Sequence, residues 1–166
     1  MADVAIVIVG FVIEFSDYIQ PVCLPDLEND IETNNFGVTI GISNYENDIS
    51  VSVLKNEIVD ITSCNSSFED NSELTSDNLF CGKYKEETCV KDFSGGFFTL
   101  NETTESITIK GLISLAYSKN KDFCDIKDLT LLIDIREYVE WIEHIVFIDK
   151  SEIKLEPILL KCSHVN

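Results

Sequence analysis

Short stretches in which apolar and polar residues alternate recur along most of the chain, and polar clusters separate them. The clearest is VSVLKNEIVDI, Val51 to Ile61, which alternates at its start and at its end. A period of two places successive side chains on opposite faces of a β-strand. Similar runs predict further strands at Val38–Ser43, Leu79–Cys81, Gly96–Leu100, Ile107–Ala116 and Leu129–Ile133. Short strands at this spacing indicate an all-β barrel or sandwich.

Two polar stretches connect neighbouring strands in this interpretation. Asn44–Asp48 is expected to be a loop, because it interrupts the apolar alternation. NETTES, Asn101 to Ser106, is expected to be the turn of a hairpin formed by the strands on either side of it.

The apolar period changes near the end of the chain. From Ile135 to Val146 the apolar residues fall at helical spacing, which predicts an amphipathic helix over Asp134–Ile148. Asp134 is suited to cap its first turn. We expect Trp141 to pack on the barrel and His144 to lie at the surface rather than to act as a ligand or base.

The first apolar run is VAIVIVGFVI, Val4 to Ile13. It is too short to span a bilayer, and it has neither the basic flank nor the cleavage site of a signal peptide. β-Branched residues dominate it, which predicts a buried strand. A secreted protein that begins directly on a core strand is expected to be incomplete.

The composition limits the classes of partner. A net charge of −18 argues against nucleic acids and anionic membranes, both of which bind basic patches. Six cysteines in 166 residues indicate an oxidising compartment, so we expect secretion. No pair of cysteines has the spacing of a zinc site, and neither a metal nor a cofactor is expected.

Several motifs resemble, in order, the C-terminal half of a trypsin-like serine protease of the chymotrypsin fold. YIQPVCLP, Tyr18 to Pro25, is similar to the segment that joins the two β-barrels of that family. CVKDFSGG, Cys89 to Gly96, resembles C-x-G-D-S-G-G, the motif that carries the nucleophile. Four shorter matches are Ala2–Ile6 with D-I-A-L-L, Leu79–Lys83 with F-C-A-G, Gly111–Ser114 with G-I-V-S, and Tyr138–Ile142 with Y-V-x-W-I.

The resemblance implies an all-β fold consisting of the second six-stranded antiparallel β-barrel and the C-terminal helix, with the first barrel missing. Residues 1–148 would form a partial peptidase domain, and residues 149–166 a tail without a clear role.

The resemblance also implies cysteine pairs. Cys64 is expected to bond Cys81, and Cys89 is expected to bond Cys124. Cys23 and Cys162 are left over, and they bond either each other or another chain.

The catalytic residues that the resemblance implies are Asp3, which orients the histidine, and Ser94, the nucleophile. In this fold the histidine precedes the aspartate, so it would lie before Met1. Neither His144 nor His164 fits that role, and a serine hydroxyl without a base is a weak nucleophile near neutral pH. The chain as given is expected to lack its base.

The residues before Ser94 depart from the family motif in either of two registers. Aligned on Cys89, the motif places Phe93 at the nucleophile position and Lys91 at the first glycine. Aligned on Ser94, it places Asp92 at that glycine, whose backbone N–H stabilises the oxyanion in the family. A side chain there strains the loop, and a carboxylate opposes the negative charge that develops during the reaction.

The substrate pocket that the resemblance implies combines residues from three segments. Glu87 lies near the position of an acidic pocket floor, although a solvated loop charge is the more ordinary interpretation. Ser114, Leu115 and Ala116 stand where the family has S-W-G, and Thr130 falls near a pocket glycine and would narrow the pocket.

Three functions are compatible with these features. The first is a secreted, catalytically impaired protease homologue that binds a protein or peptide partner at its vestigial cleft. The second is a fragment of an active serine endopeptidase whose first barrel is missing. The third is an unrelated acidic β-domain with a structural role, so whether the chain is an enzyme stays open.

Overall fold

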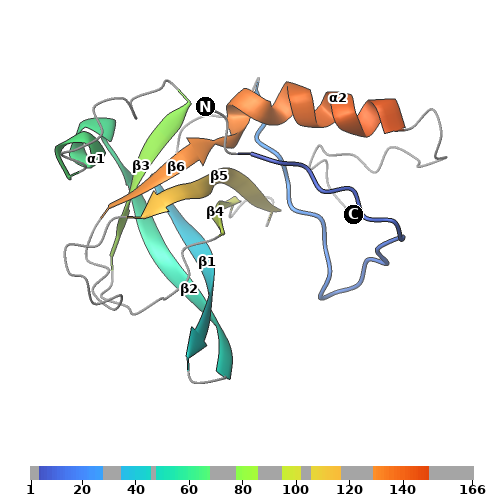
Figure 1. Ribbon diagram of the computed structural model, residues 1–166, viewed down its shortest axis with the longest axis horizontal. Helices are drawn as coiled ribbons and strands as arrows, with labels where there is room; N and C mark the ends of the chain where they lie inside the picture. Colours follow the sequence, from blue (N-terminus) through green and yellow to red (C-terminus); the bar gives the residue numbers. More distant parts are fainter. Residues whose placement is uncertain are drawn as a thin grey trace.

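A computed structural model describes residues 4–27, 35–45, 48–67, 78–85, 95–101, 106–116 and 129–149. Strands dominate the described residues (Figure 1). The elements in chain order are β1 (Phe36–Tyr45), β2 (Asp48–Val59), α1 (Ile61–Ser67), β3 (Leu79–Tyr84), β4 (Gly96–Asn101), β5 (Ser106–Ala116), β6 (Leu129–Asp134), the 3-10 helix η1 (Ile135–Tyr138) and α2 (Val139–Asp149).

The strands form a closed barrel in the order β1-β2-β3-β6-β5-β4. Every neighbouring pair is antiparallel. The barrel closes between β1 and β4, where Val38 pairs with Phe98 and Thr39 pairs with Phe97. This arrangement confirms the six-stranded antiparallel barrel and the helix that follows it.

The predicted loop at Asn44–Asp48 is too long, because β1 reaches Tyr45 and β2 begins at Asp48. Asn44 pairs with Ile49 and Tyr45 pairs with Asp48, so β1 and β2 extend into the polar stretch from both sides and project from the barrel (Figure 1), while residues 46 and 47 lie outside the described residues. Hydrogen bonding along the ladder outweighs the low strand propensity of the asparagine and aspartate. Of the predicted turn at 101–106, residues 102–105 lie outside the described residues.

The predicted strand Val51–Ile61 ends two residues early, because Ile61 already begins α1. Asp60 stops the strand: its side chain accepts hydrogen bonds from the Thr62 amide at 2.8 Å and the Thr62 hydroxyl at 2.7 Å. The hydrogen bond from the hydroxyl and, to a smaller extent, the hydrogen bond from the amide lower the pKa of Asp60. This cap turns the chain into a helix that apolar periodicity does not reveal.

The C-terminal helix begins as predicted at Asp134, but its first turn, η1, is a 3-10 helix. Asp134 accepts a hydrogen bond from the Arg136 amide at 2.9 Å and forms an ion pair with the Arg136 guanidinium at 2.6 Å. Ile135 and Val139 are buried, whereas Trp141 remains 39% exposed and meets Tyr138 edge-on. Trp141 is therefore less buried than predicted, and His144 is exposed as predicted.

The prediction of a buried strand at Val4–Ile13 is wrong. The segment forms no strand, and its side chains from Val7 onward face solvent, with Val7 83%, Phe11 71% and Val12 81% exposed. Its β-branched residues favour a strand only where a neighbouring sheet pairs with them, and no described strand does so. Further on, Cys23 joins the barrel: its amide donates to the Ile107 carbonyl, and its carbonyl accepts from the Ile109 amide, both at 3.0 Å.

No helix among the described residues has the length and apolar character needed to cross a membrane.

Candidate active-site cleft

The end of the nucleophile motif lies beside the strand that carries Ser114. The Ile113 amide donates a 3.0 Å hydrogen bond to the Gly95 carbonyl, and Gly96 pairs with Leu112. Gly95 directly follows Ser94 in the sequence, and Ile113 directly precedes half-buried Ser114. The fold therefore brings together Gly95 and Ile113, which are 18 positions apart in the sequence.

Packing limits the side chain at both glycines of the motif, most strictly at Gly95. A Cβ on Gly95 would meet the carbonyl oxygen of Ile40 on β1, and a Cβ on Gly96 would lie 2.6 Å from the Phe98 ring. Backbone at Ile40 cannot yield as a flexible side chain can, so the first position accepts only glycine without a shift of the chain. The two glycines thus serve the barrel whether or not Ser94 reacts.

Thr130 occupies a closed position in the barrel wall. It pairs with Gly82 on β3 and with Ala116 on β5, and it is 1% exposed. Its neighbour Leu131 pairs with Leu115 in the same ladder. Ser114, Leu115, Ala116 and Thr130 are therefore brought together on β5 and β6.

Thr130 belongs to a buried polar cluster that sequence analysis did not find. It consists of Thr39, Asn56, Tyr84 and Thr130, all buried and contributed by four different strands. Asn56 Nδ2 donates to Thr39 Oγ1 at 2.7 Å and more weakly to the Leu54 carbonyl at 3.4 Å. Asn56 Oδ1 and Thr130 Oγ1 have no hydrogen-bond partner.

Burial raises the pKa of the Tyr84 phenol, and the nearby hydroxyls of Thr130 and Thr39 offset part of that rise. The Thr130 hydroxyl lies beside the phenol without completing a hydrogen bond. The cluster carries no formal charge near neutral pH. One feature of the sequence could have indicated this cluster. Asn56 follows buried Leu54 by two residues on β2, so the side chains of both residues point into the barrel.

The Cys64–Cys81 disulfide implied by the resemblance is present. It joins α1 to β3 with a Cα–Cα distance of 5.8 Å, and both residues are fully buried. Leu131 packs in the same apolar cluster, directly after Thr130. Cys23 is also disulfide-bonded.

The remaining residues of the expected site lie outside the described residues. They are Asp3, Glu87, Lys91, Asp92, Phe93 and Ser94, together with the expected disulfide partners Cys89 and Cys124, and Cys162 in the tail.

Comparison with known proteins supports the fold-based interpretation. The family described as Trypsin matches residues 1–142. The chain is also similar to the clotting factor G beta subunit of Tachypleus tridentatus, with 25% identity over 166 residues. That match covers 87% of this chain and 50% of the relative, so the chain spans about half the length of the curated relative. The Trypsin family match agrees with the closed six-stranded barrel and the helix that follows it. The chain belongs to the trypsin family.

Proposed function

We propose that the chain acts as a secreted, catalytically impaired homologue of trypsin-like proteases, which binds a protein partner through its vestigial cleft. One observation carries this proposal. Thr130, at the position near a pocket glycine of the family, is 1% exposed between Gly82 and Ala116. Because the Thr130 side chain lies with Tyr84 in the polar cluster inside the barrel, this position serves the barrel core rather than an open substrate pocket.

The sequence of the nucleophile loop supports the same conclusion. Acyl transfer needs donors aimed at the developing oxyanion, and loss of one such donor costs about 2.7–4 kcal/mol of barrier. Either Lys91 or Asp92 replaces the glycine whose amide serves this purpose in the family. In the register that aligns Cys89, Phe93 also replaces the nucleophile itself.

Retention of Ser-Gly-Gly does not weaken the proposal. Gly95 and Gly96 are explained by their contacts with Ile40 and Phe98 in the barrel. Packing of the barrel therefore accounts for these two glycines without any need for a reactive serine.

Secretion is supported by the disulfides. Cys64 and Cys81 are bonded and Cys23 is bonded as well, and such bonds persist in oxidising compartments. Asn65, on exposed α1, also begins a sequence that accepts N-linked glycans in secreted proteins.

The partner-binding part of the proposal is tested by site-specific photo-crosslinking. A crosslinking residue replaces Ser114 at the cleft, and a control places it at exposed Glu140 on α2. The protein is then exposed to the extracellular fluid of its source. We expect one discrete crosslinked protein from position 114 and none from position 140; equal crosslinking from both positions would contradict a cleft-directed interaction.

An active protease is the second candidate, and the exposed apolar side chains of the N-terminal segment favour it. Val7, Phe11 and Val12 are the kind of surface that another protein module covers. In the family, a first barrel supplies both that cover and the catalytic histidine. This candidate predicts that Ser94 reacts with an active-site-directed probe, whereas the impaired homologue does not.

A further inference from the structure

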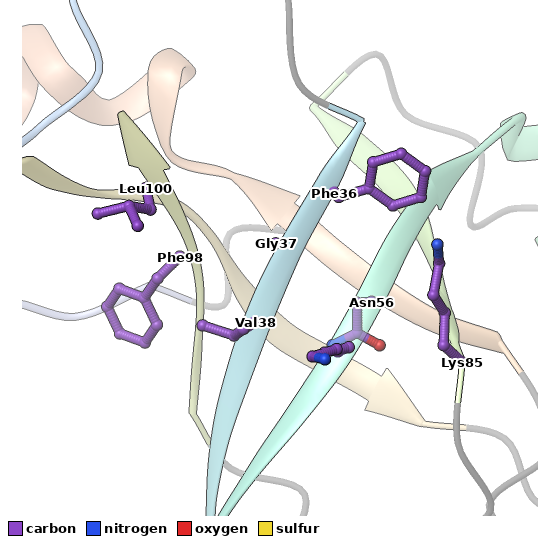
Figure 2. A pocket seen from close by; sticks show the side chains of 8 residues that line it. Phe36, Gly37, Val38, Asn56, Lys85, Phe98 and Leu100 are labelled. Carbon is purple, nitrogen blue, oxygen red and sulfur yellow. The ribbon is translucent and has the colours of Figure 1, made fainter. Parts of the chain in front are cut away.

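The outer face of the barrel carries a groove that the cleft does not use. Its lining residues are Phe36, Gly37 and Val38 on β1, Lys55 and Asn56 on β2, Lys85 after β3, and Phe98 and Leu100 on β4. The groove has a volume of about 320 Å³. Figure 2 shows Phe98 and Leu100 on one side of β1, with Phe36 and Lys85 on the other.

The floor of this groove is apolar and open to solvent. Phe36 is 46% exposed and Leu100 is 52% exposed, although both have large side chains. Ile40 on β1 and Val51 and Val53 on β2 also face outward and extend this apolar surface. Val53 pairs with Ile40 across the two strands. Continuous apolar surface on the outside of a barrel is typical of a contact site for another molecule.

Lysines line one rim of the groove in an otherwise acidic chain. The Lys85 amide donates to the Lys55 carbonyl at 3.0 Å, which places the two lysines opposite each other on neighbouring strands. Lys83 lies on the same outer face, where its cross-strand partner is Glu57. Lys85 approaches Glu57 at 4.0 Å, and its ammonium group lies 3.7 Å from the centre of the Phe36 ring.

The lysine rim has a positive local charge, opposite in sign to the net charge of the chain. Among the residues that the structure describes at this rim, Lys55, Lys83 and Lys85 against Glu57 give a charge of about +2, whereas the whole chain carries −18. Two like charges opposite each other on a ladder destabilise the free protein. A carboxylate bound between Lys55 and Lys85 would relieve that repulsion.

We infer that this groove binds an acidic, extended segment of a protein partner, with an aromatic or large aliphatic side chain seated on Phe36, Val38, Phe98 and Leu100. The acidic side chains beside that anchor contact Lys55 and Lys85. The charge complementarity selects this occupant, because a net charge of −18 disfavours an acidic segment except where lysines gather. The site lies on the outer wall and is independent of the cleft and of the function proposed for it.

Fluorescence anisotropy with two labelled synthetic peptides tests the inference. The probe is Asp-Glu-Phe-Glu-Asp, and the matched control is Lys-Lys-Phe-Lys-Lys. We expect saturable binding of the acidic peptide that weakens as salt is added, and no binding of the basic peptide. Equal binding of the two peptides, or no binding of the acidic one, would overturn the inference.

Charge variants locate the binding. Lys55→Gln and Lys85→Gln are each expected to weaken the acidic peptide by roughly twofold to fivefold, the range of an exposed ion pair. Lys110→Gln removes the same charge from β5, outside the groove, and is expected to leave the affinity unchanged. Equal losses in all three variants would assign the binding to net charge and contradict a built site.

An apolar pair of variants completes the test. Leu100→Ser is expected to weaken the acidic peptide, whereas Ile19→Ser, which changes a residue that is also 52% exposed, is not. Crosslinking from position 114 is expected to persist in all groove variants, so that failure of the groove and failure of the cleft are distinguishable. An affinity that does not respond to Leu100→Ser would reject the apolar anchor.

Discussion

The carbonyl of Gly95 accepts a 3.0 Å hydrogen bond from the Ile113 amide, while the Cα of Gly95 faces the Ile40 carbonyl. Three strands therefore converge on the residue that follows Ser94: β4, which begins at the next residue, β5 and β1. These contacts fix the position of Gly95 at the entry to β4.

Substitution of Gly95 by alanine is expected to lower the free energy of unfolding by about 1–3 kcal/mol, because the new Cβ would meet rigid backbone at Ile40. Urea unfolding followed by far-ultraviolet circular dichroism measures the change. Gly10→Ala is the control, since nothing lies within 4 Å of a Cβ at Gly10. Equal stability of the two variants would show that the loop moves aside without cost.

The polar cluster inside the barrel predicts opposite effects for two chemically identical substitutions. Thr130→Val removes a buried hydroxyl that has no hydrogen-bond partner, so we expect stability to stay the same or rise by about 1 kcal/mol. Thr39→Val removes the acceptor of the 2.7 Å bond from Asn56 and is expected to cost about 1–3 kcal/mol. A loss of stability in both variants would mean that the two hydroxyls are equally engaged.

Tyr84 predicts a change of stability at alkaline pH. Burial raises the pKa of its phenol above the usual value of 10.0 in the folded chain. Because the folded state holds this proton more tightly than the unfolded state, the stability it contributes is complete below pH 10.0 and is lost as pH rises through the folded-state pKa. Absorbance of the phenolate during alkaline titration should show one late-titrating tyrosine that is missing in Tyr84→Phe.

The exposed N-terminal segment predicts self-association of the isolated chain. Val7, Phe11 and Val12 expose most of their side chains, and exposed apolar surface of this kind promotes association. Size-exclusion chromatography should show oligomers or aggregates that decrease in a Phe11→Lys/Val12→Lys variant. We expect this association despite the high net charge of the chain. A clean monomer of the unmodified chain would contradict it.

Much of the barrel could be predicted from the sequence because alternation reports which face of a strand is buried. It located β2, β5 and β6 to within a few residues and gave the cap at Asp134. α1 was missed because ITSCNSS has no helical apolar period; the Asp60 cap and the Cys64–Cys81 bond hold it instead. Local pattern carries no information on such tertiary constraints.

The N-terminal segment and the cleft show a second limit. A run such as Val4–Ile13 indicates the need for burial but does not identify what buries it, and within the described residues no sheet does so. The motif order predicted that Gly95 and Ser114 belong to one site, and the Ile113–Gly95 hydrogen bond is consistent with that. The Thr39–Asn56 contact joins strands through side chains whose polarity suggested exposure, so sequence reasoning passed over it.

The most direct test of the central claim is reaction of the native protein with a fluorophosphonate probe, followed by mass mapping of any adduct and comparison with Ser94→Ala. Impaired chemistry at Lys91, Asp92 and Phe93 predicts that Ser94 carries no adduct under conditions that fully label an active trypsin-like protease. An adduct on Ser94 that disappears in Ser94→Ala would contradict the account and establish a working nucleophile.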